Sequence, residues 1–143
     1  MQDFTQLKVW ERSHQLTLAV YTKTRLFPKE ELYGLTSQIR RAGASVPANI
    51  AEGCGSNSSA DFAWFLQTAM RSASELHYHL ILARDLGYLD DSDHARLTEE
   101  AIGVKRMLSS LILKVRPKAV VKARQIRHAG NSANSPKLIT DNR

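Results

Sequence analysis

A row of polar side chains at helical spacing is the strongest candidate for chemistry in this sequence. The row recurs every three or four residues and consists of Gln38, Arg41, Ser45, Asn49 and Glu52. Residues at this spacing lie on one face of an α-helix. Guanidinium and amide groups suit phosphate oxygens and base edges, so this polar ladder predicts a groove or lumen that binds nucleic acid. The alternative is structural: Arg41, Asn49 and Glu52 satisfy one another and neighbouring helix ends, which fixes the register of a bundle or ring.

The second candidate is the basic C-terminal sequence. Residues 1–113 contain twelve Lys and Arg against thirteen Asp and Glu, whereas residues 114–143 contain eight against one. The net charge of +6 therefore belongs to the C-terminal segment. Such a segment binds phosphates without sequence preference and with strong salt dependence. It contains no Phe, Tyr or Trp, so it offers no base-stacking platform, and a purely solubilising role is the alternative.

We assign nucleic-acid contacts to basic residues of both candidates. Arg40 and Arg41 lie about 100° apart around a helix and cannot serve the same contact. The predicted nucleic-acid-binding residues are Arg40, Arg41, Lys114, Arg116, Lys118, Lys122, Arg124 and Arg127.

The remaining titratable residues give little support for catalysis. Arg71 and His77 are six residues apart, a pattern similar to the Arg-then-His motif of the HEPN ribonucleases, but it is short. His77 and His79 are two residues apart and point to different faces of a helix, unlike a metal-binding pair at i, i+4. No glycine-rich phosphate loop or nucleophile elbow is present. We therefore expect no catalytic residue, metal or cofactor, with a metal-independent ribonuclease as the remaining enzymatic alternative.

The composition is that of an ordinary globular domain. Apolar residues make up 43% and charged residues 24% of the 143-residue sequence, which is enough for one core. No apolar run approaches the roughly 18 residues that cross a bilayer, and the first residues lack an apolar signal region. The single cysteine, Cys54, excludes an internal disulfide and fits a reducing compartment. We expect a cytoplasmic protein.

Four helical segments are readable. The first covers about residues 5–26 and ends before Pro28. The second covers residues 32 or 34 to 52, with Pro47 expected to kink or divide it. The third covers residues 59–86, with a cap among residues 57–59, and the fourth begins at the acidic caps of residues 90–93 and ends near residue 116.

The apolar residues of these segments follow bundle spacing. The second segment carries the stripe Leu35, Ile39, Ala42, Val46 and Ile50. The third repeats apolar residues at Phe62, Leu66, Ala69, Ala73, Leu76, Leu80 and Ala83, and the fourth at Leu97, Ala101, Val104, Leu108, Leu111 and Val115. We predict an all-α, up-down-up-down four-helix bundle over residues 1–116, followed by a basic, disordered tail over residues 117–143.

The second segment also carries a family resemblance. The matching stretches read FPKEELYGLTSQ at 27–38, RRA at 40–42 and SVPANIAEG at 45–53, with supporting matches at 7–10 and 86–89. Over about residues 4–115 the chain resembles the bacterial four-helix bundle proteins named after the 23S rRNA intervening sequence. These are related to the accessory variability determinant of diversity-generating retroelements. The resemblance implies a homo-oligomeric ring, commonly a pentamer, and in the retroelement branch a basic inner surface that works with RNA and a reverse transcriptase.

Together these observations predict a non-enzymatic, ring-forming helical bundle that binds RNA or another nucleic acid electrostatically. The alternative is a protein-interaction scaffold, an accessory partner of a reverse transcriptase in a diversity-generating retroelement, whose tail only aids solubility. A ring would multiply weak phosphate contacts by the number of subunits.

Overall fold

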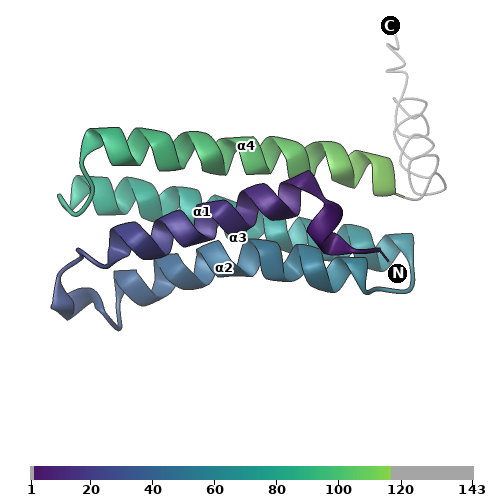
Figure 1. Ribbon diagram of the computed structural model, residues 1–143, viewed down its shortest axis with the longest axis horizontal. Helices are drawn as coiled ribbons and strands as arrows, with labels where there is room; N and C mark the ends of the chain where they lie inside the picture. The colour runs from purple at the N-terminus through teal and green to yellow at the C-terminus, as the bar shows by residue number, and fades with distance from the viewer. Residues whose placement is uncertain (1, 117–143) are drawn as a thin grey trace, which may run out of the picture.

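The computed structural model describes residues 2–116, which form helices joined by short turns (Figure 1). The four long helices are α1 (Lys8–Thr24), α2 (Leu35–Cys54), α3 (Ser59–Asp85) and α4 (Asp91–Val115), and two short 3-10 helices are η1 (Phe4–Gln6) and η2 (Lys29–Glu31). Among these described residues there is no β-strand. The predicted tail, residues 117–143, lies outside the described part of the chain.

The long helices run antiparallel to their neighbours in chain order. Contacts join α1 to α2, α2 to α3, α3 to α4 and α4 back to α1, which is the arrangement of a four-helix bundle. The α1–α2 and α3–α4 connections lie at one end of the molecule, and the start of α1 and the end of α4 lie at the other (Figure 1). The predicted all-helical architecture is therefore confirmed. None of the helices between residues 2 and 116 combines the length and apolar character needed to cross a membrane.

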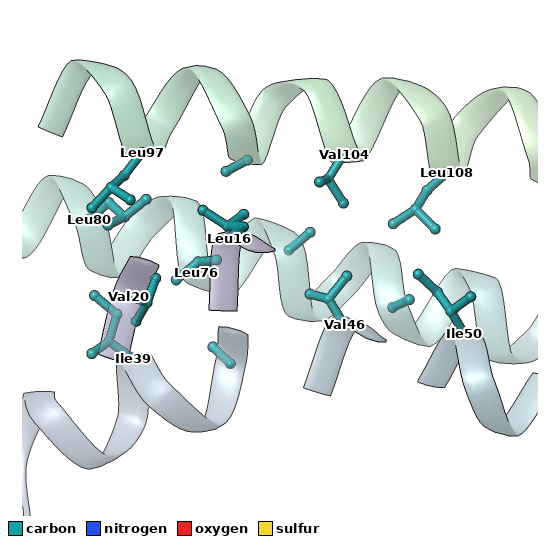
Figure 2. Packing of buried hydrophobic residues seen from close by; sticks show 14 of the residues in the cluster. Leu16, Val20, Ile39, Val46, Ile50, Leu76, Leu80, Leu97, Val104 and Leu108 are labelled. Carbon is teal, nitrogen blue, oxygen red and sulfur yellow. The ribbon is translucent and has the colours of Figure 1, made fainter. Parts of the chain in front are cut away.

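Each helix contributes one buried apolar row to a shared core. The rows of α1 and α2 meet those of α3 and α4 between the helices, where Val20, Ile39, Leu76 and Leu108 are 1% exposed or less (Figure 2). All the predicted residues of the α2 stripe are buried, as are those of α3 except Phe62, which packs against the core from its edge. Periodicity at 3.6 residues is enough to find this core because burial of one face drives bundle formation.

The predicted row on α4 is wrong in its last turn. Leu97, Ala101, Val104 and Leu108 are buried, but Leu111 and Val115 are only partly buried and Ile112 is 5% exposed instead. A row that repeats every 3.5 residues drifts by about 20° per heptad on a straight helix. After three turns, at Leu108, the next residue that faces the core is therefore four positions further on, at Ile112, and not three positions further on, at Leu111.

Side-chain caps mark the starts of α3 and α4. The Ser58 hydroxyl accepts a hydrogen bond from the Asp61 amide at the start of α3, and Asp90 accepts one from the Asp93 amide at the start of α4. Near the N-terminus, Asp3 caps η1, and Leu7 is extended before α1 begins at Lys8. The first predicted helix is thus divided, because Asp3 offers a competing capped turn.

Helix α2 passes through Pro47 as one continuous helix, so the predicted division does not occur. Proline has no amide hydrogen, which leaves the carbonyl of Gly43, four residues earlier, without its helical donor. The Thr17 hydroxyl of α1 lies 2.9 Å from that carbonyl oxygen and 2.8 Å from the oxygen of Ser13. The single hydroxyl hydrogen is shared between these two acceptors, so a side chain from the neighbouring helix supplies part of the missing donor.

Cys54 ends α2 and is buried. Its side chain is 4% exposed, and its carbonyl accepts a hydrogen bond from the backbone amide of Gln2 at 3.2 Å. Burial, with a smaller effect of the negative charge on Asp3, raises the pKa of the thiol above its usual value. This residue is consequently poorly suited to nucleophilic chemistry.

Candidate functional site

The inner part of the polar ladder joins α2 to α3. The Asn49 amide donates to the carbonyl oxygen of Ser45 at 2.8 Å and lies 3.0 Å from its hydroxyl. The Ser45 hydroxyl is in turn 2.9 Å from the hydroxyl of Ser72 on α3. These half-buried groups satisfy one another and fix the register of the two helices.

The outer part of the ladder faces solvent. Gln38, Arg41 and Glu52 are exposed, and their side chains make no hydrogen bond or ion pair with another residue of the described range. Arg41 and Glu52 are eleven residues apart, about 16 Å along the helix, so they do not satisfy each other as the structural alternative required. The ladder therefore divides into a structural pair, Ser45 and Asn49, and three exposed groups available to a partner.

Arg40 has a structural position rather than a free one. It is half-buried, and its Nε donates to the hydroxyl of Thr24 on α1 at 2.8 Å. Its guanidinium carbon lies 4.8 Å from the centre of the Tyr21 ring, within the range of a cation–π contact. Arg40 thus ties α2 to α1, and Arg41 is the more accessible of the adjacent pair.

The start of α1 and the last turns of α4 enclose a basic groove of about 420 Å³. Three cationic side chains belong to it, Lys8, Arg106 and Lys114, and no acidic residue lines it. Its other lining residues are Leu7, Val9, Met107, Ser110 and Leu111. Of the predicted nucleic-acid contacts, only Lys114 lines this groove. Lys8 and Arg106 were not predicted as contacts, and they are about a hundred residues apart in the sequence.

A second groove of about 480 Å³ continues along the α1–α4 face with a different charge pattern. The Arg12 guanidinium donates to Glu100 through Nε at 2.9 Å and through Nη2 at 3.4 Å, and it packs directly on Gly103. The hydrogen bond to Glu100 raises the pKa of Arg12. Because Glu99 also lines this groove, positive and negative charges balance there, whereas the basic groove has positive charge alone.

The remaining predicted contact residues continue from the basic groove. Arg116 is half-buried at the end of α4, where its backbone amide donates to the carbonyl of Ile112 at 3.0 Å. Lys118, Lys122, Arg124 and Arg127 lie outside the described residues. The basic sequence therefore begins next to a groove that is lined by cations without an acid.

The residues considered for nuclease chemistry do not form a site. Arg71 is exposed and His77 half-buried, their six-residue spacing places them about 120° apart, and no hydrogen bond in the described range joins them. Burial, and to a lesser extent the positive charges of Lys105 and His94, lowers the pKa of His77. Between residues 2 and 116 no group of three or more His, Cys, Asp or Glu side chains is arranged to hold a metal ion.

Comparison with known proteins places this geometry in a family context. The family model described as the 23S rRNA-intervening sequence protein matches residues 5–110. A similar solved structure is that of a protein of unknown function from the S23 ribosomal protein family of Bacteroides thetaiotaomicron. The two sequences are 27% identical. The match covers 73% of this chain and 94% of the chain in that structure, with a TM-score of 0.67. No curated protein matches the chain.

Proposed function

Because the chain belongs to the 23S rRNA-intervening sequence protein family, we propose that it is a non-enzymatic, ring-forming helical bundle that binds RNA electrostatically. The observation that carries this proposal is the basic groove between α1 and α4. Lys8, Arg106 and Lys114 gather there without an acidic neighbour in the lining, and a sequence with eight basic residues against one acidic residue begins at Lys114. The cytoplasmic location remains part of this proposal and rests on the single cysteine.

The proposed contacts are ionic and directed to the phosphate backbone. Lysine and arginine side chains bind phosphate oxygens and release condensed counterions, which makes binding steeply salt-dependent. The groove supplies a fixed part of the surface, and Arg116, Lys118, Lys122, Arg124 and Arg127 extend the charge beyond it. Arg41 is a further exposed cation, whereas Arg40 serves the α1–α2 contact.

Fluorescence anisotropy with a labelled 20-nucleotide RNA tests this function in the full-length protein. We expect affinity to fall steeply between about 50 and 200 mM salt. Lys8→Ala, Arg106→Ala and Lys114→Ala should each weaken binding several-fold and reduce the salt slope by about one unit. Lys29→Ala, an exposed lysine at the opposite end of the bundle, is the matched control and should leave the affinity unchanged.

Replacing Lys118, Lys122, Arg124 and Arg127 together by glutamine measures the contribution of the C-terminal sequence in the same assay. Loss of most affinity assigns that sequence a binding role, and unchanged affinity leaves it a solubilising one. Absence of binding by the wild-type protein, or RNA cleavage that disappears in His77→Ala, would contradict the non-enzymatic RNA-binding proposal.

A surface of α3 supports the proposed homo-oligomer. Trp64 and Tyr78 are 57% and 58% exposed, and with the exposed Arg71 and Glu75 between them they share one helix face, the α3 stripe, at positions 64, 71, 75 and 78. Trp, Tyr and Arg are the residues that most often anchor protein interfaces. We place a subunit contact of the proposed ring on this α3 stripe, and the pentameric number of subunits follows only from the resemblance to the family.

A protein-interaction scaffold is the second candidate, and one observation favours it. At the end of the bundle opposite the basic groove, the apolar side chains of Leu26, Leu32, Tyr33 and Leu86 are 85%, 50%, 94% and 49% exposed. Apolar side chains gathered at one site mark protein contacts. If a reverse transcriptase is encoded beside the gene, the purified enzyme should bind wild-type protein more tightly than Leu26→Ser/Tyr33→Ser.

A further inference from the structure

The basic groove differs from a simple phosphate-binding patch because its floor is apolar. Val9 is buried at 4% exposure, and Leu7, Met107 and Leu111 are partly buried against the core. These four side chains form the floor, and the cations belong to the same groove. Arg106 and Lys114 are eight residues apart on α4, so about 12 Å of helix separates them.

A nucleic-acid duplex cannot use such a floor. Its bases are stacked and paired, so their faces are covered, and it presents phosphates, sugars and the polar edges of the bases. The cations would meet the phosphates, but the apolar side chains would lose water without gaining an apolar partner, and the phosphates above them would lose water without gaining a donor.

An unpaired nucleotide matches both parts of the groove. Its phosphates can lie on Lys8 and Lys114, while its base turns inward onto aliphatic side chains. The Met107 sulfur is polarisable and makes favourable contacts with aromatic rings, and an arginine such as Arg106 can stack its guanidinium plane on a base. A groove of about 420 Å³ falls within the size range of pockets that accept small ring systems.

Charge along the α1–α4 face limits the path of a bound strand. Beyond Arg106 the next groove is lined by Glu99, which repels phosphate, and its other cation, Arg12, is already paired with Glu100. In the other direction lies Lys114, and no acidic residue lines that part of the groove. A strand seated in the groove therefore continues past Lys114 rather than past Glu99.

We propose that the basic groove is a site for unpaired nucleotides, with the base on the apolar floor and the phosphates on the cations. This inference rests on the proposed RNA-binding function. The protein should consequently prefer single-stranded RNA to duplex RNA of equal length. This specificity belongs to the bundle and is separate from the non-specific attraction of the C-terminal sequence.

Competition anisotropy with full-length protein tests the inference at one salt concentration of about 100 mM. Three unlabelled probes of equal length compete with the labelled strand: a single-stranded RNA, the blunt RNA duplex, and a ribose-phosphate strand without bases. We expect the single strand to bind about fivefold or more tightly than either of the other two. Equal binding of all three probes would overturn the inference and leave electrostatic binding intact.

Variants separate the floor from the cations. Leu111→Ala and Leu7→Ala should each weaken binding of the single strand and leave the affinities for the duplex and the base-free strand unchanged. The ratio of single-strand affinity to duplex affinity should therefore fall toward one. Leu113→Ala removes an exposed leucine on the same helix that does not line the groove, and it should change nothing. Lys114→Ala should weaken all three probes alike.

Thermal melting of each variant establishes that it is folded at the assay temperature. If Leu111→Ala and Leu7→Ala, both folded, weaken all probes equally, the floor does not contact a base and the inference is wrong. Failure of every probe to bind wild-type protein would instead overturn the RNA-binding proposal itself.

Discussion

Thr17 occupies a position where one hydroxyl serves two helices. It lies within hydrogen-bond distance of Ser13 in its own helix and of Gly43, the carbonyl that Pro47 leaves without a donor. Thr17 and Gly43 are both buried, so water cannot substitute. A buried carbonyl without a donor costs free energy, so loss of this hydrogen bond should destabilise the folded protein by more than loss of an exposed one.

Replacing Thr17 by valine keeps the shape of the side chain and removes only the hydroxyl. We expect Thr17→Val to lower the free energy of unfolding by about 1–2 kcal/mol, measured by urea denaturation. Thr22→Val is the matched control, because the exposed Thr22 hydroxyl bonds only to Leu18 in its own helix, at 3.1 Å. Equal effects of the two substitutions would show that the Gly43 carbonyl does not depend on Thr17.

His77 predicts a pH dependence of stability. Burial and the nearby positive charges lower its pKa in the folded protein, while the unfolded chain keeps the ordinary value near 6.5. As the pH falls through 6.5, the unfolded state therefore binds a proton more readily than the folded state, and stability decreases. Urea denaturation at pH 7 and pH 5 should show a smaller decrease for His77→Gln than for wild type. An identical decrease would assign the acid sensitivity to other groups.

At the scale of the helices, the sequence predicts what depends on one helix alone. The α2 stripe, the apolar rows of α3 and α4 apart from Phe62, Leu111 and Val115, and caps within residues 57–59 and 90–93 follow from local spacing and are confirmed. The exact row of the last turn of α4 was missed because a small drift accumulates along a straight helix. The sequence left open whether Pro47 kinks or divides α2, because the hydroxyl beside the Gly43 carbonyl comes from α1.

In the candidate site, too, contacts between different helices could not be predicted from the spacing within one helix. Gln38, Arg41 and Glu52 are exposed, but spacing alone could not separate these residues from Ser45 and Asn49, whose partner Ser72 is on α3. The basic groove could not be predicted from the sequence of α1 or of α4 alone, because it forms between the two helices. Lys8 becomes significant only when the fold places the start of α1 beside the end of α4.

The packing of α2 against α3 at Gly53 and against α1 at Gly43 predicts opposite responses at these two glycines. A Cβ on Gly53 would lie 2.9 Å from the Cβ of Phe65, an atom fixed by the α3 backbone, whereas a Cβ on Gly43 would meet its nearest neighbours at 4.0 Å. We expect Gly53→Ala to destabilise the protein by about 1–3 kcal/mol through overpacking. Gly43→Ala should be neutral or stabilising by up to about 1 kcal/mol, because alanine favours helix. Thermal melting of both variants compares them, and a stable Gly53→Ala would contradict this account.

The whole molecule has two chemically different ends. The start of α1 and the last turns of α4 carry Lys8, Arg106 and Lys114. The α1–α2 and α3–α4 connections lie at the other end of the bundle (Figure 1), and their apolar residues Leu26, Leu32, Tyr33 and Leu86 are exposed. The proposed RNA contact and a proposed protein contact therefore do not compete for the same surface. The α3 stripe lies along the side of the bundle and leaves both ends free for these partners.

Assembly through the α3 stripe predicts a charge-swap result. Arg71 forms no ion pair within the described residues, and Glu75 is 3.9 Å from His79 on its own helix. If Arg71 pairs with Glu75 of another copy, Arg71→Glu and Glu75→Arg should each dissociate the oligomer, and the double substitution should restore it. Light scattering after size-exclusion chromatography measures this, with Arg25→Glu at the bundle end as the control. A monomeric wild type, or a double variant that stays dissociated, would remove the stripe as a subunit contact.

Cys54 gives the protein a built-in reporter of local opening. It is the single thiol of the sequence, it is buried where α2 turns into α3, and its raised pKa keeps the reactive thiolate scarce while the turn is closed. Modification by a thiol reagent therefore requires the junction to separate, whether or not the rest of the bundle unfolds. The labelling rate of the natural sequence, without any introduced probe, measures how often this end of the α2–α3 hairpin comes apart.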